Sequence, residues 1–127
     1  MRNYQRKRQN PYLLPHNVYM QVLYLIRDYD RMQQVRADIL NGSAPHDGTP
    51  HTAHGNPTES KAIKLASLDH RCEQIDAAIA SVPREYRKAV WENICRRAPY
   101  PSDAGEATYK RWRCRFVWQV AKNMDFI

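Results

Sequence analysis

The sequence predicts an all-α protein, with a long antiparallel helical hairpin followed by a compact helical C-terminal domain. Apolar residues recur at alternating spacings of three and four over most of the 127 residues, which is the period of an α-helix. No segment shows the alternation of apolar and polar residues expected of a half-buried strand. One irregular stretch, SAPHDGTPHTAHGNP, separates two helical segments of similar length and is rich in Gly and Pro.

The first predicted helix begins after Pro15 and runs to about Leu40. It ends at Asn41-Gly42, a typical helix stop. Its apolar stripe consists of Val18, Val22, Leu25, Tyr29, Met32, Val35 and Ile39. A single stripe of this length predicts one unbroken helix.

The second predicted helix opens with Asn56 as N-cap, Pro57 at the first position and Glu59 at the third. In this arrangement the cap side chain and the glutamate satisfy backbone donors of the first turn. Its apolar stripe is Leu65, Leu68, Cys72, Ile75, Ile79 and Val82. The helix ends at Pro83. Each helix has one narrow stripe, so an antiparallel hairpin is the simplest way to bury both, as a core, an arm or a dimerisation element.

Two further helices are predicted in the C-terminal third. The first spans about Glu85 to Arg97, with inward side chains Tyr86, Ala89, Val90 and Ile94. The second starts near Asp103 as its cap, with Glu106 three residues later, and runs to about Met124. Its apolar side is predicted to hold Tyr109, Phe116, Val117, Val120 and Met124, and its opposite side Arg111, Arg115, Trp118 and Lys122. The predicted organisation is a basic tail (1–15), the hairpin (16–82, loop 41–56) and a C-terminal domain (83–127).

The positive charge is concentrated at the two ends of the chain. The net charge is +7, from 20 basic and 13 acidic residues. Residues 1–9 carry four basic and no acidic side chains, and residues 84–127 carry ten basic and five acidic ones. This segregation favours a polyanion partner contacted by the tail and the C-terminal third. The tail residues Arg6, Lys7 and Arg8 fit a flexible DNA-contacting arm and a disordered tail without such a role equally well.

The segment ATYKRWRCRFVWQVAK (107–122) is the strongest candidate for function. As a recognition helix, it would enter the major groove of DNA with its first turns. The candidate contact residues are Thr108, Lys110, Arg111, Cys114, Arg115 and Lys122, with Trp112, Phe116 and Val120 as anchors. The alternative, a solvated basic face on a core helix, is the less favoured of the two. Arg113 projects toward the apolar side and would need an acid or a DNA phosphate. Trp118 lies in the basic face, and its burial by the tail, a second subunit or the hairpin is favoured over stacking on a base.

Catalytic, metal-binding and membrane functions are not expected. The sequence has no glycine-rich phosphate loop, nucleophile elbow or HExxH motif, so it predicts neither an enzyme nor a cofactor. The loop residues His46, Asp47, His51 and His54 lack metal-ligand spacing, and His70, Cys72 and Cys95 are a weaker metal set still. The three cysteines, Cys72, Cys95 and Cys114, are predicted to be reduced thiols. A mean hydropathy of -0.78 and an N-terminus without a signal pattern predict a cytoplasmic protein.

Three segments carry a family resemblance: YLLPHNVYMQVLYLIRDYDRM, the DGTP and NPTESKAIKLA elements, and VPREYRKAVWENICRRAPYPSDAGEATYKRWRCRFVWQVAKNM. Together they resemble the small phage and prophage proteins of Gram-positive bacteria grouped with the ArpU and RinA late transcriptional regulators. The resemblance implies a C-terminal helix-turn-helix like the promoter-binding part of sigma factors. The DNA-contacting positions it implies are Thr108, Tyr109, Lys110, Arg111 and Arg115. Here only PYPSDAG precedes the last helix, so the module is abbreviated.

The leading interpretation is therefore a transcriptional regulator that binds duplex DNA in the bacterial host cell and forms a homodimer through the hairpin. The alternative is a protein-interaction module whose hairpin docks on RNA polymerase, a packaging complex of the small-terminase kind or a host target.

Overall fold

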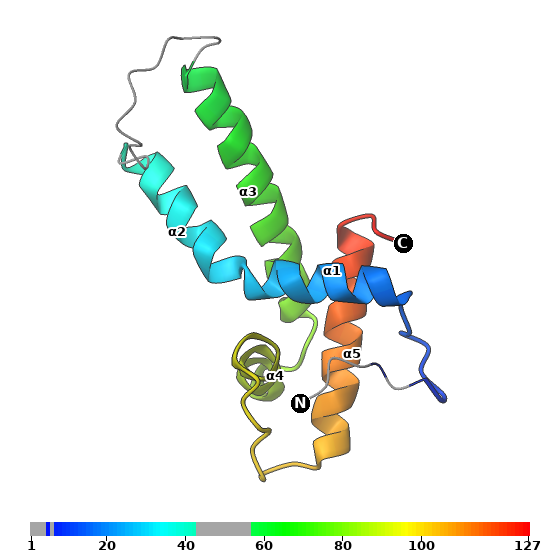
Figure 1. The fold of residues 1–127 in the computed structure, drawn as a ribbon. Coiled ribbons are helices and arrows are strands. Elements are labelled where there is room, and N and C mark those ends of the chain that lie inside the picture. Colours follow the sequence, from blue (N-terminus) through cyan, green and yellow to red (C-terminus); the bar gives the residue numbers. More distant parts are fainter. Residues whose placement is uncertain (1–4, 6, 43–56) are drawn as a thin grey trace. The chain divides into compact units, whose positions relative to one another are not determined.

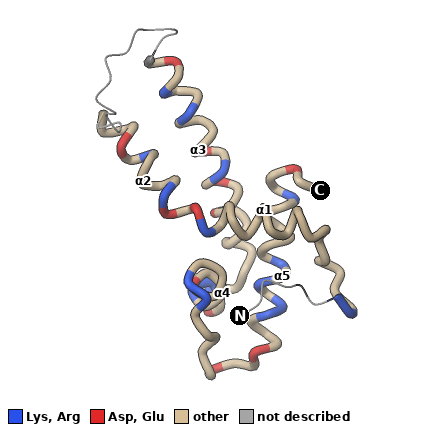
Figure 2. Tube along the Cα trace, viewed as in Figure 1, with Lys and Arg blue, Asp and Glu red and all other residues tan. Residues whose placement is uncertain are grey.

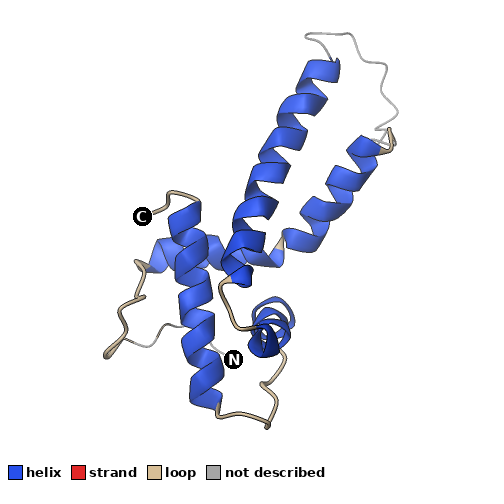
Figure 3. Ribbon diagram, turned by 180° about the vertical axis from the view of Figure 1, so that it is seen from behind, coloured by secondary structure: helices blue, strands red, loops and turns tan. Residues whose placement is uncertain are grey.

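The computed structural model describes residues 5, 7–42 and 57–127 (Figure 1). Every regular element within these residues is a helix, which confirms the all-α prediction (Figure 3). The helices are α1 (His16–Arg27), α2 (Tyr29–Leu40), α3 (Pro57–Ala80), α4 (Arg84–Arg96) and α5 (Glu106–Asn123). The predicted N-cap Asn56 and the candidate metal ligands of the loop, His46, Asp47, His51 and His54, lie outside the described residues, as does Arg6.

The chain divides into two compact units. The core unit comprises the described residues of Met1–Arg27 and Gln74–Ile127, and the α2–α3 unit comprises those of Asp28–Glu73. The helix α3 contributes its first part to the α2–α3 unit and its last part to the core unit. This division differs from the predicted borders after residues 15 and 82, because the first predicted helix is shared between the two units.

The prediction of one unbroken helix from residue 16 to about residue 40 is wrong. The helix α1 ends at Arg27 and α2 begins at Tyr29. Between them Asp28 has ψ −1°, well away from the helical value of about −42°. Both carboxylate oxygens of Asp28 accept hydrogen bonds from Arg31 at 2.6 Å. Aspartate favours helix starts over helix interiors, and this side chain makes its bonds at the start of α2.

In the core unit, α1, α4 and α5 pack against one another. Its largest fully buried apolar side chains are Leu23, Ile26, Ile75, Ile94, Tyr109 and Phe116. The buried residues of α1 are Tyr19, Val22, Leu23 and Ile26, so the predicted stripe through Val18 and Leu25 was displaced. The predicted apolar side of α5 is confirmed for Tyr109, Phe116, Val117 and Val120.

The start of α5 also differs from the prediction. Its N-cap is Gly105, and no side chain caps the helix. The carboxylate of Asp103 instead accepts a hydrogen bond from the hydroxyl of Tyr109. At the end of α4, Arg97 takes the left-handed conformation with φ 55°, and the backbone N–H of Ala98 bonds to the carbonyl of Glu92. This turn ends α4 and begins the connection to α5.

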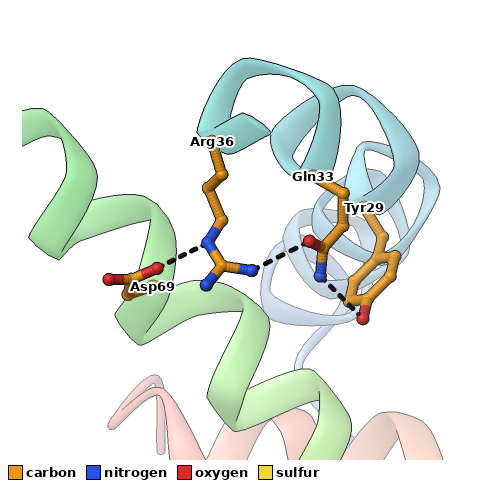
Figure 4. Close-up of polar contacts among 4 residues, drawn as sticks. All are labelled: Tyr29, Gln33, Arg36 and Asp69. Carbon is orange, nitrogen blue, oxygen red and sulfur yellow. Dashed lines mark hydrogen bonds and ion pairs between the residues drawn. The ribbon is translucent and has the colours of Figure 1, made fainter. Parts of the chain in front are cut away.

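In the α2–α3 unit, α2 and the first part of α3 lie side by side (Figures 1 and 3). Of its described residues only Met32, Leu68 and Cys72 are buried. A polar chain links the two helices: Arg36 donates to Asp69 on α3 and to Gln33 (2.8 Å), and Gln33 donates to the hydroxyl of Tyr29 (2.9 Å), as Figure 4 shows. The bond between Arg36 and Asp69 therefore joins α2 to α3, and those through Gln33 hold Arg36 on its own helix.

Candidate nucleic-acid interface

A row of basic side chains runs along the solvent side of α5. At about 100° per residue, Arg111, Arg115 and Lys122 fall within a sector of about 40°. All three side chains are exposed, and blue segments recur along α5 in Figure 2. At 1.5 Å per residue the row is about 16 Å long. We call these three residues the α5 ridge. Lys110 is exposed too, but it lies about 100° from Arg111 and pairs with Glu106 at 3.6 Å.

Two cations of the α5 ridge lie on tryptophan rings. The guanidinium carbon of Arg115 is 5.5 Å from the ring centroid of Trp112, and the Nζ atom of Lys122 is 5.1 Å from that of Trp118. Such cation–π contacts contribute about 0.5–1 kcal/mol at exposed sites. They also restrict where the charged groups lie, so the ridge is partly ordered before any partner binds.

The cover over Trp118 comes from the N-terminal segment. The ring of Tyr12 meets the ring of Trp118 edge-on, with centroids 5.3 Å apart. The sequence favours burial of Trp118 by the tail, a second subunit or the hairpin, and the structure shows the first of these. The outward-facing tryptophan is thus part of the packing within the core unit.

A closed loop holds Tyr12 in place. The side-chain amide of Gln5 donates to the carbonyl of Leu14 and accepts from its backbone N–H, both at 2.8 Å, and the Leu14 side chain is buried. The basic residues Lys7 and Arg8 are exposed within this loop. The described residues of this segment are thus held at two points, by the hydrogen bonds between Gln5 and Leu14 and by the packing of Tyr12 on Trp118 of α5.

Arg113 faces the interior of the core unit, and its partner is not the expected acid or phosphate. Its Nη1 donates to the hydroxyl of Tyr19 at 2.7 Å, and its guanidinium lies 5.9 Å from the centre of that ring. Its Nε is buried and has no acceptor among the described residues. A tyrosine supplies both an oxygen and a π face, so it takes the place of a carboxylate.

Trp112 is the first of four aromatic rings in a row that ends in the segment between α4 and α5. Trp112 stacks on Tyr86 at 6.4 Å, Tyr86 meets Tyr109 edge-on at 5.4 Å, and Tyr109 stacks on Tyr100 at 5.2 Å. Tyr109 is 1% exposed, so its predicted contact with DNA is wrong: it is a core residue. Its hydrogen bond to Asp103 raises the pKa of Tyr109 to about 12.

Hydrogen bonds fix the other end of this aromatic row. The hydroxyl of Tyr100 donates to Oδ1 of the buried Asn93 at 3.1 Å, and Nδ2 of Asn93 donates to the carbonyl of Ala98 at 2.9 Å. Burial raises the pKa of Tyr100 to about 12, against the opposing charge of Arg113. Sequence reasoning missed both Tyr100 and Asn93. The sequence signal for Tyr100 is its place between two prolines, in a segment that has no helical period.

The remaining residues predicted to contact DNA are less exposed to solvent. Thr108 and Cys114 are half-buried on α5. The backbone N–H of Thr108 bonds to the carbonyl of Gly105, within the first turn. The structure therefore leaves the α5 ridge, Lys110, Lys7 and Arg8 as the exposed basic members of the predicted set.

Across residues 5, 7–42 and 57–127, no three His, Cys, Asp or Glu side chains are grouped so as to hold a metal ion. None of the described cysteines forms a disulfide bond. No helix in this part of the chain is long and apolar enough to cross a membrane. No family model, curated protein or solved structure matches the chain.

Proposed function

We propose that this protein is a DNA-binding transcriptional regulator of the phage or prophage type, which binds duplex DNA through the α5 ridge. The observation that carries the proposal is the ridge itself: three exposed cations in one row, with no carboxylate of the described chain paired to any of them. The major groove of B-DNA is about 12 Å wide and admits an α-helix. The resemblance to the ArpU and RinA regulators supports the role in transcription.

Two stretches of α5, one before Trp118 and one from Trp118 onward, suit different contacts. Near its C-terminal end, Trp118 is covered by the loop that carries Lys7 and Arg8. These two residues and Lys122 are suited to phosphates, which bind cations without reading sequence. The first turns, with Arg111 and Arg115, are free of that cover and are suited to enter the groove.

Salt dependence and a double substitution test the proposal. Each phosphate neutralised adds about −0.9 to the slope of log affinity against log salt. Replacing Arg111 and Arg115 by Ala is expected to lower affinity for duplex DNA roughly 10- to 100-fold at moderate salt. Fluorescence anisotropy of a labelled random-sequence duplex at several salt concentrations measures both quantities.

The matched control removes the same charge from the other unit. Lys61 and Lys64 are exposed on the first part of α3, so K61A with K64A leaves the α5 ridge intact. Equal losses in the two double variants would mean that only net charge matters. Salt-insensitive binding, or no binding at low salt, would refute the phosphate-based mechanism.

A second candidate function is protein association through the α2–α3 unit. Leu40 and Ile63 are each 65% exposed in a unit that has few buried side chains. Such residues suit self-association, or docking on RNA polymerase or a packaging complex. Sedimentation of the protein alone distinguishes a monomer, a dimer and a ring-like oligomer. A concentration-independent monomer would argue against the expected homodimer.

A further inference from the structure

Arg115 differs from the other ridge cations in how it is held. Its guanidinium lies on Trp112, Trp112 lies on Tyr86, and Tyr86 packs against the buried Tyr109. Each ring in this series is fixed by the next one. The side chain of Arg115 is therefore oriented by packing that begins in the core of the unit.

The donors of Arg115 are nevertheless unused. No carboxylate, carbonyl or hydroxyl of the described chain accepts a hydrogen bond from it. A guanidinium carries five N–H donors in one plane, in a fork that matches two acceptors on one edge. Arg115 is thus suited to bind a group that presents two hydrogen-bond acceptors in one plane. The O6 and N7 atoms of guanine offer this geometry, and so do two oxygens of a phosphate.

Position along α5 favours the base edge over the phosphate. Arg115 lies in the third turn of α5, one turn after Arg111 and one turn before Trp118, the residue on which Tyr12 of the N-terminal loop packs. Lys122, by contrast, lies on Trp118 beside Tyr12, and an ammonium is a point charge without a planar fork. The two cation–π pairs on α5 are therefore suited to different tasks.

We propose that Arg115 sets the sequence preference of this protein by donating two hydrogen bonds to the O6 and N7 atoms of one guanine in the major groove. Trp112 and Tyr86 are positioning residues, because they hold the guanidinium in its orientation without touching the base. This inference rests on the proposed binding of duplex DNA and adds to it a specific base contact.

The experiment is selection from a pool of random duplexes by the full-length protein, followed by sequencing. The wild-type pool is expected to converge on a motif that contains a G·C pair. R115K keeps the charge and removes the planar fork, so it is expected to lower the preference for that pair about 5- to 150-fold. Its affinity for random DNA should stay within about twofold of the wild type, because the charge is unchanged. R84K makes the same change at the exposed Arg84 of α4, outside the α5 ridge, and is the matched control that should retain the same G·C pair.

Two variants of Trp112 test its positioning role. W112L removes the ring face and is expected to lose the G·C preference, whereas W112Y keeps an aromatic face and is expected to retain much of it. Thermal unfolding of both variants shows whether stability, and not orientation, accounts for a loss. If W112Y and W112L lose the preference equally at matched stability, the positioning role is refuted.

The possible outcomes separate the inference from the function on which it rests. If wild-type protein fails to bind any duplex, the proposed function fails. If it binds with a salt slope but without sequence preference, or if R115K keeps the G·C pair, only the inference fails. If R115A weakens binding uniformly across sequences and reduces the salt slope by about 1, Arg115 contacts a phosphate and the guanine contact is refuted.

Discussion

The two units of this protein are built in different ways. The core unit is closed by buried side chains from α1, α4 and α5, together with four packed aromatic rings. Among the described residues of the α2–α3 unit only Met32, Leu68 and Cys72 are buried, and Arg36 pairs with Asp69 between its two helices. Both units are helical, so the difference lies in packing rather than in secondary structure.

This difference matters for the proposed function. A basic helix reads DNA only if its side chains are held within a small range of positions, and the core unit supplies that support for α5. The α2–α3 unit exposes Leu40 and Ile63, and few apolar contacts hold it closed. Regions of this kind open locally at lower free energy than well-packed cores. We therefore expect the α2–α3 unit to unfold before the core unit.

The largest effect is expected from F116A. The Phe116 side chain is fully buried on α5, and its truncation should lower the free energy of unfolding by about 3–5 kcal/mol. All three tryptophans, Trp91, Trp112 and Trp118, lie in the core unit, so their fluorescence follows that unit alone. Denaturation followed by fluorescence should therefore show a large fall in midpoint.

The control for F116A is L68A, in the α2–α3 unit. It should lower the midpoint of part of the helical circular dichroism and leave the tryptophan transition nearly unchanged, because Leu68 is buried in the other unit. Coincident shifts of both signals in both variants would show that the two units unfold as one, and the comparison would fail.

A smaller effect is expected at high pH, again in the core unit. The pKa values of Tyr100 and Tyr109 are raised to about 12 in the folded protein, above the ordinary value of 10.0. The unfolded chain thus loses these protons at lower pH than the folded one. Their contribution to stability is complete below pH 10 and is lost as pH rises to about 12.

Denaturation at intervals between pH 8 and pH 12, followed by tryptophan fluorescence, measures this loss. Y100F and Y109F should each flatten the fall in midpoint, because phenylalanine has no proton to lose. Y24F is the control, since Tyr24 is 62% exposed on α1. An unchanged pH profile in Y100F and Y109F would mean that other groups cause the alkaline loss.

The sequence predicted the helical class and most of the α5 face because both follow from a local period. The spacing of Phe116, Val117 and Val120 places them on one side of any α-helix, and the structure buries all three. The charges on the opposite side follow from the same geometry. Local patterns were also sufficient for the limits of α4, which differ from the prediction by one residue at each end.

The sequence-based predictions failed where contacts between distant residues, and not the local period, determine the structure. The break at Asp28 was hidden because the apolar stripe continues across it at helical spacing. The family resemblance implied a DNA contact for Tyr109, whereas the helical period had placed it on the apolar side of the last helix, and the structure buries it there. The docking of Tyr12 on Trp118 joins residues far apart in sequence, and no periodicity encodes such a pair.

The smallest expected effect belongs to the α2–α3 unit and its ion pair. Arg36 and Asp69 are partly exposed, with side-chain exposures of 29% and 35%, so solvent screens their attraction. D69N should therefore speed amide exchange in α2 and the first part of α3 by roughly two- to fivefold. Hydrogen exchange followed by mass spectrometry resolves this change by segment. D38N is the matched control, since Asp38 accepts a hydrogen bond from Gln34 within α2 and does not join the two helices. If D69N speeds exchange in α4 and α5 as much as in α2, the ion pair supports the whole chain, and the two units are not independent.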